Sequence, residues 1–145
     1  MTAPDIATDN VERLITLTER LTERLAVDSQ AFEARRPHEA ADRLAETTRL
    51  ANLYRHECVR VKQDPSLIAG APEHLRQQLT RSSEAFEAVL ARHGRALFAA
   101  KAVTEGVVRA IAEEVAKSRA KVAGYGPGAM PPKASTSAIT LNHRA

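Results

Sequence analysis

The residues that could do chemistry are few, and their spacing does not assemble a reactive site. His56 and Cys58 form the closest histidine–cysteine pair, but a metal site needs three or four converging ligands, and no second pair supports this one. Cys58 also lies on the apolar stripe of a predicted helix, which indicates a buried structural thiol. We therefore expect no metal ion in this protein.

Two further features resemble ligand-binding or catalytic motifs only superficially. The cluster Gly124-Tyr-Gly-Pro-Gly128 follows a helix rather than a strand and lacks the Lys-Ser/Thr pair of a phosphate-binding loop, so helix termination explains it better. Glu113 and Glu114 are adjacent on a helix and point in different directions, which excludes a working carboxylate pair. No Ser-His-Asp or Cys-His arrangement can be argued, and we expect neither enzymatic activity nor a bound cofactor.

The composition predicts an all-α fold. Aromatic residues make up only 3% of the 145 residues and tryptophan is absent, while Ala, Leu, Arg and Glu dominate. Such a chain builds long helices whose seams are formed by Leu, Val and Ala in place of aromatic centres. No stretch sustains the alternation of apolar and polar residues that is typical of a half-buried strand.

The sequence also indicates a cytoplasmic protein. No apolar run approaches the roughly 18 residues that a membrane span needs. The segment Met1-Thr-Ala-Pro-Asp-Ile6 has neither the basic nor the apolar region of a signal peptide. Cys58 is the only cysteine, so it cannot form an internal disulfide, as is usual for a protein of a reducing compartment.

Positive charge is concentrated at the C-terminal end. The net charge is +3, but no acidic residue follows Glu114. The basic residues beyond it are Lys117, Arg119, Lys121, Lys133 and Arg144. A basic tail can bind nucleic acid or anionic lipid. These charges are spread thinly, however, whereas dedicated nucleic-acid arms are denser and often carry stacking aromatics.

The chain is organised around one long apolar-periodic stretch, residues 72–122. Its apolar residues recur in steps of three, four and seven, which places them along one side of a helix. They are Leu75, Leu79, Phe86, Val89, Leu90, Leu97, Ala100, Val103, Val107, Ile111 and Val115. Pro72 suits the first helical turn, and only Gly94 and Gly106 weaken the interior, each by about 1 kcal/mol relative to alanine.

Two shorter helices are predicted before this stretch, in an antiparallel hairpin. Asp9 is expected to cap the first, with Glu12 at its third helical position. Pro37 ends the first helix and starts the second after a short turn, and Asp64-Pro65 ends the second. The apolar stripe of the second helix comprises Ala40, Leu44, Thr47, Ala51, Tyr54, Cys58 and Val61.

These patterns divide the chain into three parts. We expect a disordered N-terminus over residues 1–8, a helical bundle domain over residues 9–125 and a mobile basic tail over residues 126–145. The tail is rich in Pro, Ser, Thr and Ala and has too little apolar mass to fold alone.

The two hairpin helices are too short to cover the long helix. Each runs for about 26 residues, or about 39 Å, against about 75 Å for a continuous helix of about 50 residues, so the hairpin reaches only to around Leu97. The long helix could break at Gly94 or Gly106 and fold back into a four-helix bundle, or the chain could self-associate. Alternatively the uncovered stripe could bind another protein, as exposed apolar stripes on soluble proteins commonly do.

The arrangement resembles the FlgN-type flagellar export chaperones, in their alphaproteobacterial branch. The most specific stretch is His93-Gly-Arg-Ala-Leu-Phe-Ala-Ala-Lys-Ala-Val-Thr-Glu-Gly-Val-Val-Arg-Ala-Ile-Ala-Glu-Glu114. It is followed by the glycine cluster 124–128 and by Ala138-Ile-Thr-Leu-Asn142. The similarity covers most of the chain, but it is a pattern of helical residues without a catalytic signature.

The resemblance implies a cytosolic chaperone that uses neither ATP nor a metal. Such a protein binds the terminal helices of hook–filament junction proteins, keeps them unassembled and delivers them to the flagellar type III export apparatus. An amphipathic cargo helix would complete the bundle along the uncovered half of the long helix. The candidate contact residues are Val103, Val107, Ile111 and Val115, with Tyr125 at the edge.

Two other functions remain open on sequence grounds. The main alternative is a structural coiled-coil or oligomerisation scaffold without an export role. The weaker alternative is a nucleic-acid or membrane binder that acts through the basic tail. The free chaperone should be a monomer or a weak dimer, whereas a scaffold should oligomerise tightly by itself.

Overall fold

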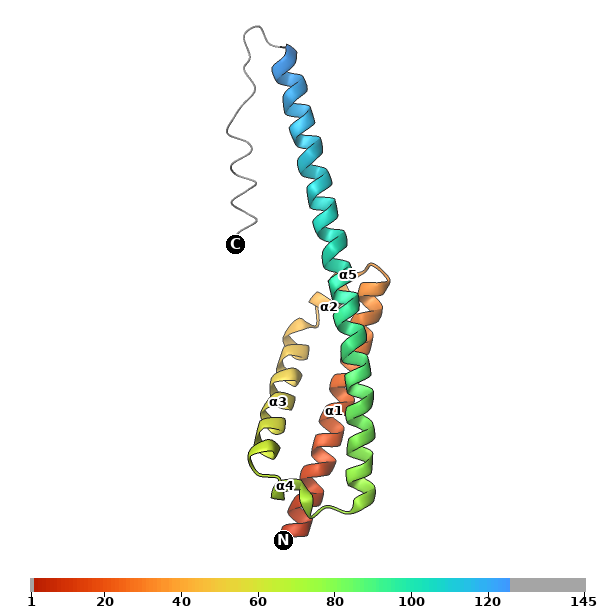
Figure 1. The fold of residues 1–145 in the computed structure, drawn as a ribbon, viewed down its shortest axis with the longest axis vertical. Helices are drawn as coiled ribbons and strands as arrows, with labels where there is room; N and C mark the ends of the chain where they lie inside the picture. The colour runs from red at the N-terminus through yellow and green to blue at the C-terminus, as the bar shows by residue number, and fades with distance from the viewer. Residues whose placement is uncertain (1, 126–145) are drawn as a thin grey trace. The chain divides into compact units, whose positions relative to one another are not determined.

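The structure, a computed structural model, describes residues 2–125, and the part that it describes contains helices and no strand. The helices are α1 (Ala3–Glu33), α2 (Pro37–Ala41), α3 (Leu44–Gln63), α4 (Ser66–Ala69) and α5 (Glu73–Tyr125). The predicted all-α fold, with a hairpin packed on one overlong helix, is confirmed (Figure 1). The predicted mobile tail over residues 126–145 lies outside the described residues.

The chain divides into two compact units, and the bundle domain over residues 9–125 stays a prediction. The first unit comprises residues 1–102 and the second begins at Val103. Helix α5 contributes to both, because it passes through Gly94 and Gly106 without a break. The fold-back at these glycines, one of the three arrangements left open by the sequence, is therefore wrong.

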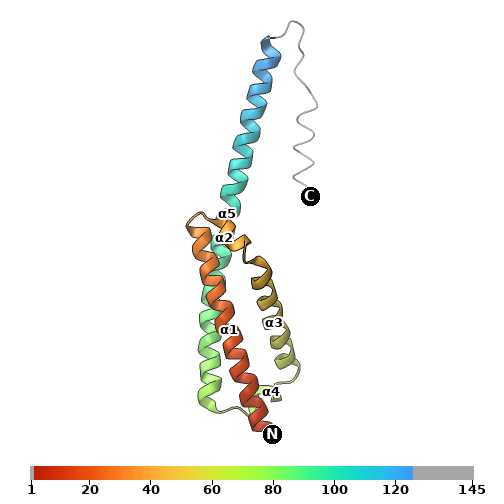
Figure 2. The same cartoon turned by 180° about the vertical axis from the view of Figure 1, so that it is seen from behind.

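In the first unit, α3 runs antiparallel to α1 while the N-terminal half of α5 runs parallel to α1 (Figures 1 and 2). The parallel order follows from contacts at both ends of α1. Ala7 and Val11 pack in the cluster that Leu75 adjoins, whereas Phe32 makes an edge contact with His93, with ring centroids 5.8 Å apart. Helix α1 thus forms the centre of the bundle.

The apolar core consists of two clusters along α1. The first joins α1 to the segment before α5 and contains Ala7, Val11, Ile15 and Ala71, with Ile68, Leu75 and Leu79 packed against it. The second joins α1, α3 and α5 and contains Leu21, Leu25, Leu50 and Phe86, with Leu17, Tyr54 and Val89 packed against it. The predicted stripes include Leu75, Leu79, Phe86 and Val89 of α5 and Tyr54 of α3, whereas Leu50 and Ala71 were not predicted.

The N-terminal segment corrects a prediction, because residues 3–8 are helical rather than disordered. Helix α1 begins at Ala3, not after Asp9. The backbone N–H of Thr2 donates to the carboxylate of Asp5 (3.1 Å), as in one half of a capping box. Ala7 is 1% exposed in the first core cluster with Ala71. The contact that orders this segment joins residues far apart in the chain, so local sequence does not reveal it.

The connection from α1 to α3 contains a break that the sequence did not predict. The predicted second helix is divided into α2 and α3 at Asp42–Arg43. Arg43 turns back to the buried carboxylate of Asp28, with Nη2 3.2 Å from Oδ1, and the Thr47 hydroxyl donates to Oδ2 at 3.4 Å. As a result Leu44, predicted on the inner stripe, is 61% exposed, and Leu50 is buried in its place.

Burial along α5 ends where the hairpin length predicts. Ala96 is the last buried residue of α5 among those whose side chains are described, one position before the expected limit at Leu97. Leu97 itself is half-exposed, because Ala96 rather than Leu97 faces the bundle. The connection between α3 and α5 includes the short helix α4, and Ile68 packs against the first core cluster.

Candidate functional site

The predicted contact residues lie on the C-terminal half of α5 and form an exposed apolar row. We call Val103, Val107, Ile111 and Val115 the α5 stripe. Their exposed fractions are 57%, 54%, 59% and 45% in that order. Tyr125 ends α5, and the role predicted for its side chain lies outside the part of the chain whose side chains the structure describes.

The α5 stripe is more than a scatter of exposed apolar residues. Single apolar side chains are common on protein surfaces and need no explanation. Here four β-branched residues follow each other in steps of four on one helix, so their side chains adjoin from turn to turn. Burying each would be worth about 1.5–3 kcal/mol. A contiguous surface of this kind is typical of a protein-binding site.

Sequence reasoning missed two neighbours of the stripe. Val108 and Val122 are 60% and 75% exposed. The signal that could have found them is the seven-residue spacing of Val108, Val115 and Val122. In the first unit, Phe98 is also 75% exposed and was not predicted.

The surroundings of the stripe are mainly charged and small side chains. Its polar neighbours on α5 are charged residues of both signs, including Arg109, Glu113, Glu114, Lys117 and Arg119. Over residues 2–125 the structure brings no three His, Cys, Asp or Glu side chains together in a way that could hold a metal ion. The surface is suited to binding another apolar helix.

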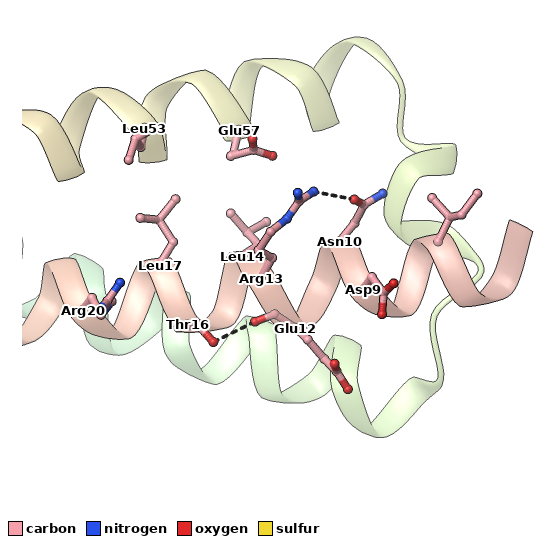
Figure 3. A pocket seen from close by; sticks show the side chains of 11 residues that line it. Asp9, Asn10, Glu12, Arg13, Leu14, Thr16, Leu17, Arg20, Leu53 and Glu57 are labelled. Carbon is pink, nitrogen blue, oxygen red and sulfur yellow. Dashed lines mark hydrogen bonds between the residues drawn. The ribbon is translucent and has the colours of Figure 1, made fainter. Parts of the chain in front are cut away.

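A second surface feature is an open groove of about 780 Å³ between α1 and α3 (Figure 3). Ile6, Leu14 and Leu17 of α1 and Leu53 of α3 supply its apolar lining. Charged side chains from both helices surround it, namely Asp9, Glu12, Arg13, Arg20 and Glu57. The groove arises because α3 buries only Thr47 and Leu50.

Three polar side chains of the groove, Asn10, Arg13 and Glu57, make hydrogen bonds within the protein. Asn10 Nδ2 donates to the carbonyl of Leu67 (2.9 Å), and Arg13 Nη2 donates to Asn10 Oδ1 (2.8 Å), as Figure 3 shows for the second bond. Glu57 accepts from Arg60. The first bond ties α1 to α4, the others lie within α1 or α3, and the three do not converge on a ligand position.

The pKa shifts of Tyr54 and Asp5 also follow from local packing and hydrogen bonds. Desolvation raises the pKa of Tyr54 to about 12, with further contributions from a hydrogen bond with Cys58 and from the charges of Cys58 and Glu87. Hydrogen bonds from Thr2 lower the pKa of Asp5. Cys58, predicted as a buried thiol, is a free thiol and only half-buried.

The described helices contain no segment that is long and apolar enough to cross a membrane. No protein-family model matches the chain, and no solved structure matches it either.

One curated protein resembles the chain over nearly its full length. The flagellar basal-body protein FlbY of Caulobacter vibrioides is 54% identical over 142 residues, which cover 96% of this chain and 95% of that protein. The chain belongs to the FlbY family. This match supports the flagellar part of the resemblance seen in the sequence, while the chaperone part stays a prediction.

Proposed function

We propose that the protein is a cytoplasmic flagellar export chaperone, without enzymatic activity, that binds hook–filament junction proteins through the α5 stripe. A flagellar role is supported by the identity to the flagellar basal-body protein FlbY. The observation that carries the binding role is the exposure of Val103, Val107, Ile111 and Val115 on one helix.

The physical basis is the completion of a helical bundle. A cargo helix with apolar residues at positions i, i+3, i+4 and i+7 could lie along the α5 stripe and bury both apolar faces. A cargo held in this way would be unable to use the same helix for assembly. Binding of this kind needs no nucleotide and no metal.

Isothermal titration calorimetry of the purified protein with each purified hook–filament junction protein tests the proposal. We expect a defined complex with at least one of them and loss of binding when the terminal helices of the cargo are removed. A negative heat-capacity change should accompany binding, because apolar surface is buried. Absence of binding to every junction protein would contradict the chaperone role and favour a scaffold.

A further inference from the structure

A second observation on α5 concerns a heptad pattern that includes residues beyond the α5 stripe. Taking Val108 as position a, the same position recurs at Val115 and Val122, and position d falls on Ile111 and Ser118. Val108, Val115, Val122 and Ile111 are 60%, 45%, 75% and 59% exposed. Their spacing of three and four residues is that of a coiled-coil seam.

The heptad positions that point away from the seam are polar or small, as a coiled coil requires. Positions b, c and f hold charged residues and alanines, namely Arg109, Ala110, Glu113, Ala116, Lys117 and Ala120. The only large apolar side chain next to the seam in this segment is Val107, at position g. Since the heptad is apolar on one side and polar or small on the other, it presents one face to a partner helix.

We propose that this heptad face is covered by the same segment of a second copy of the chain, in a parallel two-stranded coiled coil over residues 107–122. Valine at three successive a positions is the a-position pattern of two-stranded parallel coiled coils, although position d holds Ile111 and Ser118 in place of leucine. Charge complementarity sets the orientation, because Glu114 occupies position g and Arg119 the following position e. In a parallel pair these residues meet across the interface twice, as Glu114 with the partner's Arg119 and the reverse.

The opposite orientation does not offer this pairing. An antiparallel pair with the same seam has two registers: an axis near residue 113 brings the two Glu114 carboxylates together and leaves Val122 outside the seam, whereas an axis near residue 116 pairs Glu114 with Lys121 and leaves Val108 outside the Val, Ile and Ser layers. Within residues 2–125 neither Glu114 nor Arg119 takes part in an ion pair of its own chain. The parallel arrangement pairs both charges and keeps all three a-position valines in the seam, which neither antiparallel register does.

The interface is short, so the dimer should be weak. Residues 107–122 span only about 23 Å of helix, and an area below about 1,200 Å² is typical of transient association. We expect monomers to dominate at low concentration and dimers at high concentration. This inference does not rest on the proposed chaperone role, because it is tested with the purified chain alone.

Sedimentation velocity over a range of protein concentrations tests the dimer. The variant Val108→Glu with Val122→Glu places charge at two a positions and should weaken association at least tenfold. The matched control, Ala116→Glu with Ala120→Glu, adds the same charge on the outer face of the same segment and should leave association unchanged. A chain that stays monomeric at all concentrations, or a control as damaging as the seam variant, would overturn the proposal.

Two further variants test the orientation. With Cys58→Ser as background, Ser118→Cys should form a disulfide-linked dimer much faster than Ala120→Cys, because a parallel seam places the two residues 118 side by side and the two residues 120 on the outer face. Arg119→Glu should weaken association, and adding Glu114→Arg should restore it. Equal cross-linking at both positions, or no restoration by the second charge change, would overturn the parallel arrangement.

Discussion

Tyr54 illustrates how a single residue links packing to ionisation in this bundle. Its ring packs on Phe86 with centroids 4.8 Å apart, and its pKa is raised to about 12, mainly by desolvation. The raised pKa means that folding favours the protonated hydroxyl. This contribution to stability is complete below the unfolded pKa of about 10 and is lost as pH rises towards 12.

We therefore expect the free energy of unfolding to fall between about pH 10 and pH 12 by more in the wild type than in Tyr54→Phe. The variant keeps the aromatic ring against Phe86 but has no hydroxyl to ionise. Urea titrations at a series of pH values measure the difference. The same alkaline decline in both proteins would show that Tyr54 does not couple ionisation to folding.

A second residue-scale prediction concerns the buried ion pair between Asp28 and Arg43. Asp28 is 4% exposed, and breaking such a pair from one side typically costs about 3–5 kcal/mol, because the partner charge is left uncompensated. Arg43 is partly exposed, so we expect Asp28→Ala to cost about 2–3 kcal/mol. Chemical denaturation measures this cost.

The matched control is Glu46→Ala, which removes the partner of Arg24 in an ion pair between the same two helices. Glu46 is exposed, and surface pairs contribute about 0–1 kcal/mol. If both substitutions cost the same, the Asp28–Arg43 pair does not anchor the break between α2 and α3.

At the scale of elements, α5 contains two glycines that nothing in its surroundings requires. A Cβ added at Gly94 or Gly106 would meet no atom within 4 Å, and glycine in a helix interior is about 0.5–1 kcal/mol less favourable than alanine. Gly94→Ala should therefore raise the free energy of unfolding by that amount. Gly106→Ala should slow amide hydrogen exchange around residue 106.

Gly70→Ala serves as the control for both substitutions. Gly70 follows α4, and its added Cβ would lie 3.6 Å from the Cβ of Ala7, so no helix-propensity gain is expected there. Destabilisation by Gly94→Ala would indicate that α5 needs a bend at this position, in contradiction to the continuous helix.

Element types and the core were predictable because helix period is a local property of the sequence. The stripe through Leu75, Leu79 and Phe86 and the uncovered half of α5 both followed from spacing and length. The errors occurred where tertiary contacts decide. Ala7 orders the N-terminus by packing with Ala71, and the break before Leu44 coincides with the contact of Arg43 with Asp28.

The candidate surface was predictable only in part. Counting steps of four from Val103 found the α5 stripe, but the heptad that includes Val108 and Val122 appeared only when their exposure was known. The groove between α1 and α3 depends on how few α3 residues are buried, which periodicity alone does not reveal.

At the scale of the whole molecule, we propose that the first unit holds the fold and that the second recognises the binding partner. The residues that hold the bundle, such as Leu21, are buried in the first unit, whereas the α5 stripe is exposed in the second. Substitutions should therefore separate into those that unfold the protein and those that abolish binding.

Binding of hook–filament junction proteins to the double variant Val107→Glu with Ile111→Glu tests this central claim most directly, measured by calorimetry beside thermal melts. Both side chains are exposed, so the melting temperature should change little. Binding should be lost, since each buried apolar contact is worth about 1.5–3 kcal/mol and an unpaired buried charge adds to the cost. Leu21→Glu, the control in the core, should unfold the bundle. A double variant that melts like Leu21→Glu, or that binds cargo with wild-type affinity, would contradict the account.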